Sequence, residues 1–255
     1  MSVTPKEVRR EANLTERAYQ YLEEGILDVR FAPGMRVSEA EVARSLQMSR
    51  GPVREALRKL ESVGLVTREA NRGARVADFN EKELGDLDAL RSHLLSLAGR
   101  LAAEHARPVQ IEKMSDIIEQ MGVAVGAKNY SAYPDLNFQF HRLLNEMGGN
   151  EKLSELINQI YRQISRYHLL AMSYREGLED SIESHRRILA AITAGDAAAA
   201  ERELSDHGRL SYQILLSNFG RIRQAFQPRD AKHIYNDHSF GNGANNDSLR
   251  SAITG

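Results

Sequence analysis

The 255-residue sequence contains no cysteine and no tryptophan, and its net charge at neutral pH is only −1. The absence of cysteine excludes a disulfide scaffold, a cysteine-ligated zinc finger and thiol catalysis. No apolar run approaches the roughly 18–20 residues that a membrane-spanning helix needs. The N-terminal residues mix charges of both signs without a following hydrophobic stretch, which argues against a signal peptide. We therefore expect a soluble, cytoplasmic globular protein with no membrane partner.

Because the overall charge is near zero, any nucleic-acid site must come from a local concentration of charge. Residues 44–75 hold 8 basic and 3 acidic side chains, and this is the concentrated basic stretch of the sequence. It is therefore where we look for a phosphate-binding surface.

The basic stretch lies in a series of short helical patterns near the start of the chain. Apolar spacing predicts a first helix from Leu14, with Thr15 as its N-cap. Ser38 and Glu41 have the spacing of a capping box for a second helix, and Pro52 suits the first turn of a third.

Two short strands are predicted after the third helix, over residues 65–67 and 74–76, with a turn between them. Two helices, a tight turn, a third helix with basic residues near its start and a hairpin form the pattern of a winged helix-turn-helix. We assign this DNA-binding domain to residues 13–78, after a flexible N-terminus of residues 1–12.

The third helix carries its basic side chains on one face. Arg50, Arg54 and Arg58 recur every four residues, opposite an apolar stripe. Arginine near the start of such a helix binds guanine edges or phosphates. The alternative is a solvated basic face paired with Glu55 and Glu61, but the order and spacing of the neighbouring elements favour DNA binding. The predicted DNA-binding residues are Ser49, Arg50, Arg54, Arg58 and, at the hairpin tip, Arg72 and Gly73.

The remaining sequence shows helical periodicity without a strand pattern, so we predict an all-α bundle over residues 79–226. Residues 227–255 are polar and are predicted to be a disordered tail. The fold class is therefore mainly α, a winged helix-turn-helix with a small β-hairpin followed by a helical bundle. The helices of the bundle are predicted to start near Asn80, Pro108, Tyr130, Leu153, Glu176 and Ala197.

Three histidines of the bundle have spacings that suit a metal site. His141 follows Asn137 by one helical turn, so the two side chains share a face. His185 and His207 stand 10 residues before and 12 residues after Gly195, and a chain reversal at Gly195 would place both imidazoles at a similar height. Three imidazoles and an amide oxygen suit zinc, with nickel or manganese as alternatives. The competing interpretation is that each histidine is an ordinary surface or core residue.

Residues 14–76 resemble the winged-helix domain of GntR transcription regulators. The resemblance implies that Arg50, Arg54 and Gly73 meet the operator. Ala40 stands where some members have arginine, and Gly51 stands where threonine is usual, so two family contacts are expected to be missing. The stretches that carry the resemblance are residues 26–27, 33–39, 42–43, 48–61, 64–66 and 72–76.

Residues 81–225 resemble the FCD ligand-binding domain of the FadR-type branch of this family. The resemblance implies a metal held by the same four residues, with asparagine at position 137 where many members have aspartate, and hence a weaker affinity. Leu95 replaces a frequent glutamate. The matching residues include Arg91, Asn137, Phe140, His141, Gly149, Asn150, Ser184, His185, Gly195, Asp196 and His207.

A metal with open coordination positions inside the bundle would bind a small carboxylate effector, and the planar fork of Arg91 suits the same group. The alternative for Arg91 is a surface salt bridge with Asp86 or Asp88. The predicted effector-binding residues are Arg91, Arg162 and Tyr167, and the predicted metal ligands are Asn137, His141, His185 and His207.

Together these patterns predict a bacterial, ligand-responsive transcription regulator, a repressor rather than an enzyme. A homodimer would place two third helices in successive major grooves of a pseudo-palindromic operator. The effector would change the spacing of the two DNA-binding heads. Two alternatives stay open, a metal-dependent enzyme and a metal sensor that uses the three histidines. Against the enzyme, Glu183 is close to His185 only in sequence, and no other general base is evident.

Overall fold

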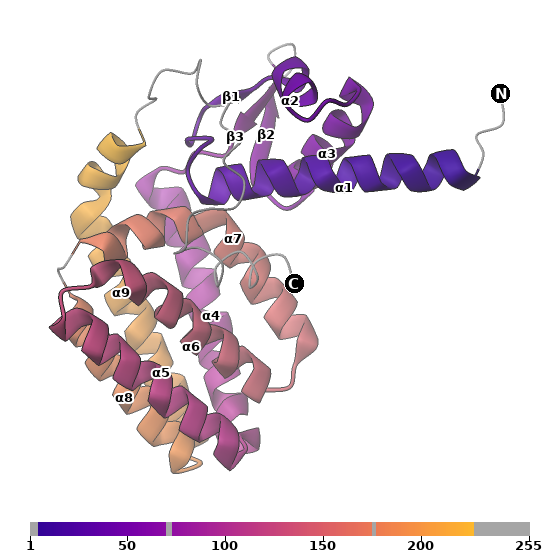
Figure 1. Cartoon of the computed structure of the whole chain (residues 1–255). Helices are drawn as coiled ribbons and strands as arrows, with labels where there is room; N and C mark the ends of the chain where they lie inside the picture. Colours follow the sequence, from indigo (N-terminus) through magenta and orange to yellow (C-terminus); the bar gives the residue numbers. More distant parts are fainter. Residues whose placement is uncertain (1–4, 70–72, 175–176, 227–255) are drawn as a thin grey trace. The chain divides into compact units, whose positions relative to one another are not determined.

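The computed structural model describes residues 5–69, 73–174 and 177–226, which fold into nine α-helices and a three-stranded sheet (Figure 1). Their contacts divide the chain into two compact units, whose main parts are residues 5–79, here the N-terminal unit, and Asn80–Ile222, here the helical unit. The predicted tail lies outside the described residues. Within the described ranges, no helix is long and apolar enough to cross a bilayer.

The N-terminal unit has the predicted winged helix-turn-helix fold. Three strands form an antiparallel sheet in the order β1-β3-β2, in which Val37 pairs with Ala74 and Thr67 pairs with Arg75. The strand β1 was not predicted from the sequence. The elements in chain order are α1 (Pro5–Leu27), β1 (Arg36–Val37), α2 (Glu39–Ser45), α3 (Arg50–Ser62), β2 (Val66–Glu69) and β3 (Gly73–Val76).

The predicted start of the first helix was wrong. Helix α1 begins at Pro5 and extends into the segment expected to be flexible, so Thr15 lies inside the helix and is not its N-cap. Proline is favoured in the first turn of a helix, and the residues up to Ala12 are mostly strong helix formers.

The turn between α2 and α3 fixes the direction of α3. The Ser38 hydroxyl accepts a hydrogen bond from the Glu41 amide at 3.3 Å, which confirms the predicted cap of α2. After α2, Gln47 adopts a positive φ of 52°, and the Met48 amide donates to the Ala43 carbonyl at 2.9 Å. One residue in the left-handed region is enough to reverse the chain tightly before α3.

The apolar stripe of α3 faces the core of the N-terminal unit. Val53, Ala56, Leu57 and Leu60 are fully buried against α1 and the sheet. Because the core takes this side of the helix, the arginines on the opposite side face solvent.

The helical unit contains six α-helices and one short 3₁₀ helix among its described residues. The predicted start of a helix near Asn80 is confirmed. Asn80 is the N-cap of this helix, and its side chain and that of Glu83 form a reciprocal capping box. The predicted helix from Tyr130 starts instead as the 3₁₀ helix η1 (Tyr130–Ala132). The helices are α4 (Glu81–His105), α5 (Pro108–Gly126), α6 (Tyr133–Met147), α7 (Glu151–Ser173), α8 (Leu178–Thr193) and α9 (Ala197–Ala225).

Helix α4 packs against α6, α7 and α8 (Figure 1). Its buried face carries a charged pair, Asp88 and Arg91, between apolar neighbours such as Leu84 and Leu95. In contrast, Leu90 and Leu97, which belong to the leucine repeat that identifies the helix in the sequence, are 58% and 42% exposed. The core side of α4 is therefore partly ionic, while apolar side chains face solvent.

Candidate functional site

Helix α3 presents a row of arginines to solvent. Ser49 is its N-cap, and the Ser49 hydroxyl makes no capping hydrogen bond. Ser49 and Arg50 are exposed, and the side chains of Arg54 and Arg58 are about half exposed, at 50% and 59%. Four of the predicted DNA-binding residues therefore lie on one helix and are accessible, two at its start and two along its exposed face.

Two of these arginines form ion pairs. Arg54 contacts Glu39 of α2 at 3.1 Å, and Arg58 contacts Glu55 at 2.6 Å. Glu61, the other expected partner, pairs instead with Arg68. Exposed ion pairs of this kind are weak and exchange readily for another anion. No sequence pattern indicates the contact between Glu39 and Arg54, because the two residues are fifteen positions apart on different helices.

The hairpin places a glycine at the start of β3. Gly73 is exposed and has a φ of 84°, a left-handed conformation that glycine adopts without strain. Arg72, the other predicted wing residue, lies outside the described residues.

In the helical unit, the three predicted histidines meet in the interior. The ring nitrogens that would serve as ligands in His141, His185 and His207 all lie within 4.8 Å of one another. They come from α6, α8 and α9, so the predicted convergence across the reversal at Gly195 is confirmed. Asn137 borders the same cavity as His141 and His207, and its role as a fourth ligand stays a prediction.

The chemical state of these histidines suits a metal. Burial lowers the pKa of His207 to about 3 and holds the pKa values of His141 and His185 well below the ordinary range. All three rings are therefore neutral at pH 7 and offer a lone pair. Within the described chain, neither ring nitrogen of His185 has a side-chain hydrogen-bond partner, although the side chain is fully buried. Buried polar atoms rarely stay unpaired without a ligand or a water molecule.

Side chains around the cluster hold the rings in place. The Ser184 hydroxyl lies 3.2 Å from Nδ1 of His207, which leaves Nε2 directed toward Nε2 of His141 at 3.3 Å. Phe140 packs edge-on against His185, with ring centroids 4.3 Å apart. A polar contact behind one ring and an aromatic wall behind another are the kind of support that fixes metal ligands.

Next to the histidines lies a buried ionic network centred on Asp88. Its Oδ1 atom is 2.7 Å from Nη2 of Arg91 and 3.2 Å from Nε2 of His168, and Nδ1 of His168 lies 3.3 Å from the Ser211 hydroxyl. The side chains of Asp88 and Arg91 are only 2% and 6% exposed. The alternative prediction of a salt bridge between Arg91 and Asp88 is therefore confirmed in its partner, but its location on the surface was wrong. Asp86 pairs instead with Lys82 on the surface.

Burial alone would raise the pKa of Asp88, but the positive charge of Arg91 and the contact with His168 outweigh it, so the net pKa lies far below its ordinary value. Asp88 is therefore a carboxylate throughout the physiological range, and it compensates the buried guanidinium.

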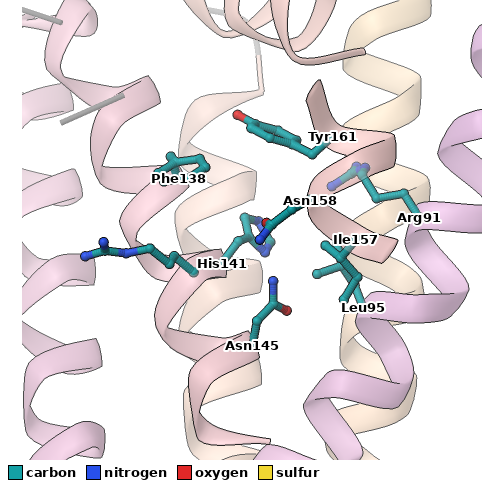
Figure 2. Close-up of a pocket in the computed structure, with 9 residues that line it drawn as sticks. Arg91, Leu95, Phe138, His141, Asn145, Ile157, Asn158 and Tyr161 are labelled. Atoms are coloured by element: carbon teal, nitrogen blue, oxygen red, sulfur yellow. The ribbon is translucent and has the colours of Figure 1, made fainter. Parts of the chain in front are cut away.

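Two cavities meet at Arg91, His141 and Tyr161, which line both. The first, here the histidine cavity, is also lined by Asn137, His168 and His207. The second, here the amide cavity, is also lined by Leu95, Asn145 and Asn158 (Figure 2).

Arg162 and Tyr167 do not line either cavity. The residues of α7 that line the cavities include Tyr161 and His168, which are seven residues apart and thus on one helical face. Neither Arg162 nor Tyr167 is among them. Sequence analysis missed Tyr161 and His168 as cavity residues. No partner was found for His168 because Asp88 lies on another helix.

Comparison with known proteins supports this two-part architecture. Residues 14–76 match the family described as bacterial regulatory proteins, gntR family, and residues 86–210 match the FCD domain. The chain is 31% identical over 208 residues to the probable D-xylose utilization operon transcriptional repressor of Paenarthrobacter nicotinovorans, covering 81% of this chain and 90% of that protein. It is 25% identical to the HTH-type transcriptional repressor RspR of Escherichia coli, covering 83% and 91%.

Among solved structures, Escherichia coli McbR/YncC aligns with a TM-score of 0.61 and 22% identity, over 84% of this chain and 99% of that one. A GntR regulator from Rhodococcus aligns with a TM-score of 0.59, over 84% and 99%. The fold and these relatives define a DNA-binding transcription regulator, not an enzyme. The chain belongs to the GntR family, with a C-terminal FCD domain.

We expect Asp88→Asn to lower the free energy of unfolding by about 3–5 kcal/mol, because it leaves the guanidinium of Arg91 buried without a compensating charge. Since the folded-state pKa of Asp88 is lowered, its contribution is fully present above the unfolded pKa of about 4. It begins to fall near that value and is lost progressively as the pH drops toward the folded-state pKa. The measurement is urea unfolding of both proteins at pH 7 and pH 3.5, where the difference should narrow at the lower pH. Asp86→Asn is the matched control on the same helix and should leave the midpoint unchanged. Equal midpoints for wild type and Asp88→Asn at pH 7 would contradict the account.

Proposed function

We propose that this chain is a cytoplasmic, metabolite-responsive repressor that binds a pseudo-palindromic operator as a homodimer. The observation that carries the proposal is the exposed arginine face of α3. The side chains of Arg50, Arg54 and Arg58 point away from the core. The Ser49 hydroxyl and the first backbone amides of α3 lie at the start of the same helix, where a phosphate binds well. In this arrangement α3 lies in the major groove, with Arg50 and Arg54 nearest to the base edges and Ser49 at the phosphate backbone. Gly73 and Arg72 contact the adjacent minor groove.

A homodimer is supported by the apolar side chains that α4 leaves exposed. Leu90 and Leu97 lie two turns apart on one face of the helix. A second copy of the chain would remove them from water, and the resulting twofold symmetry would match two operator half-sites.

We further propose that His141, His185 and His207, with Asn137, hold a divalent metal, zinc rather than nickel or manganese. FCD domains often bind metals, and the three imidazoles are close together and neutral. When bound, the metal would supply a positive charge with open coordination positions beside the cavities.

The effector is a small carboxylate. A metal at the histidines, together with Arg91, would place more positive charge in the interior than Asp88 alone neutralises, and an organic anion would restore the balance. Arg91 lines both cavities and offers planar donors to such an anion. This arrangement favours an organic acid as effector over the metal alone.

Selection from random DNA with the purified chain is expected to enrich a short inverted repeat. Arg54→Ala should weaken binding to that repeat by about tenfold or more, because the lost side chain reads base edges or clamps a phosphate. Arg186→Ala, which removes an exposed, ion-paired arginine from the helical unit, is the matched control and should bind as wild type does. Enrichment of no motif, with binding that only weakens as salt rises, would contradict sequence-specific recognition.

Zinc titration of the metal-free chain, followed by calorimetry and by thermal unfolding, should show one site per chain and a rise in the unfolding temperature. His185→Ala should weaken zinc binding by about 100-fold or more, because it removes a ligand from a buried site. His93→Ala, which changes an exposed histidine of α4, should have no effect. If His185→Ala binds zinc as tightly as wild type does, the metal does not lie at the three histidines.

A further inference from the structure

The small sheet of the N-terminal unit carries two arginines on its outer face. Arg36 of β1 pairs in register with Arg75 of β3, and Thr67 of β2 continues the same row across the three strands (Figure 1). Residues directly opposite each other in an antiparallel sheet share a face. The adjacent pair, Val37 and Ala74, is buried in the core of this unit. The row that holds the two arginines therefore faces away from that core.

Arg75 has a structural role within this row. Its side chain is half-buried, and its Nη1 atom donates a hydrogen bond to the Gly34 carbonyl at 2.9 Å. Gly34 lies in the turn before β1 and has a positive φ of 75°. The guanidinium of Arg75 thus joins this turn to β3.

Arg36, in contrast, is exposed and lies beside the predicted wing residue Gly73. A Cβ atom at position 73 would come to 3.8 Å from the Nε atom of Arg36 and to 3.9 Å from its Nη2 atom. The guanidinium of Arg36 therefore reaches from β1 to the start of β3, next to the hairpin tip that the proposed function places on DNA.

The pairing of Arg36 with Arg75 has a cost in the free protein. Like charges directly opposite each other destabilise a sheet. Position 36 is exposed, so the fold would accept an uncharged polar residue there. An anion that binds over this row would relieve the repulsion between the two guanidinium groups. The pair of arginines therefore points to an anionic ligand on the outer face of the sheet.

The anion that this position fits best is a phosphate of the operator. The minor groove of DNA is only about 6 Å wide, so a hairpin tip that enters it at Gly73 has a row of phosphates on either side. A guanidinium beside Gly73 would lie next to one of these rows. Its planar donors suit two phosphate oxygens.

We propose that Arg36 contacts an operator phosphate at the edge of the minor groove, beside Gly73. This inference rests on the proposed function, in which the hairpin binds DNA, and adds a residue to the DNA-binding surface. Phosphate contacts fix the position of a protein on the duplex without reading the bases. Arg36 therefore contributes affinity, while the choice of sequence depends on α3.

The test is binding of the full chain to the selected operator, measured by fluorescence anisotropy over a range of salt concentrations. Arg36→Gln removes the charge and keeps much of the side-chain length. We expect it to weaken binding by about tenfold at about 0.15 M salt, and to reduce the slope of log affinity against log salt by about two for a dimer, because each phosphate contact contributes about 0.9. Arg36→Lys keeps the charge and should bind within about threefold of wild type.

Two comparisons make this result specific. Selection from random DNA with Arg36→Gln should enrich the same inverted repeat as wild type does, because a phosphate contact carries no base preference. Arg17→Gln is the matched control, since it removes an exposed arginine from α1, which packs against the core side of α3. It should bind with the affinity and the salt slope of wild type.

Thermal unfolding without DNA separates a DNA contact from a structural role. Because Arg36→Gln removes a repulsion between two strands, it should not lower the unfolding temperature. Arg75→Gln removes the same repulsion but also breaks the hydrogen bond to Gly34, so it should unfold at a lower temperature than Arg36→Gln does.

The outcomes separate this inference from the proposed function. If Arg36→Gln binds the operator with the affinity and salt slope of wild type, or enriches a different repeat, the inference is wrong and the proposed function stands. A lowered unfolding temperature of Arg36→Gln would also overturn it, because the arginine would then serve the fold. If wild type itself enriches no motif, the proposed function fails, and this inference fails with it.

Discussion

The helical unit depends on compensating the positive charge that Arg91 brings to the interior beside the cavities. Arg91 lies on the core side of α4, and a buried guanidinium is costly unless a carboxylate compensates it. Asp88, one turn earlier on the same helix, provides that carboxylate. His168 of α7 contacts Asp88, and Ser211 of α9 contacts His168 in turn. The same burial that makes this pair necessary also keeps the three neighbouring histidines neutral. Charged side chains thus occupy interior positions at which helical bundles usually have apolar side chains such as leucine.

This arrangement supports the proposal of an anionic effector in the interior. Asp88 balances Arg91 alone, so a metal at the neutral histidines would leave excess positive charge that a carboxylate can offset. An anion bound at this site would stabilise the bundle by its binding free energy. If that binding free energy differs between the DNA-bound and the free protein, the operator affinity changes by the same amount. In the N-terminal unit, Arg54 has a weak, exposed partner in Glu39, and DNA phosphates could replace that partner at little cost.

Local signals in the sequence were sufficient for much of the fold. The cap at Ser38, the proline of α3 and the start of α4 near Asn80 each depend on residues within four positions of one another, and all three were predicted correctly. The two-residue strand β1 was missed because it is too short to show a period, and the early start of α1 was missed because its first turns carry no apolar stripe. The helical spacing on either side of Gly195 was enough to predict that the histidines lie close together. The contacts of Glu39, Tyr161 and His168 arise between separate elements, and no spacing rule within one helix could find them.

The most direct test of the account is the effect of an acid on operator binding, measured by fluorescence anisotropy with the selected operator and one equivalent of Zn²⁺. With wild-type protein, a small carboxylate such as butyrate should weaken operator binding by about fivefold or more, which is the lower range of allosteric coupling. Arg91→Lys should bind the operator as wild type does without the acid and should not respond to it. An operator affinity that is independent of the acid in wild type, or that changes equally in Arg91→Lys, would contradict a receptor built around the buried arginine.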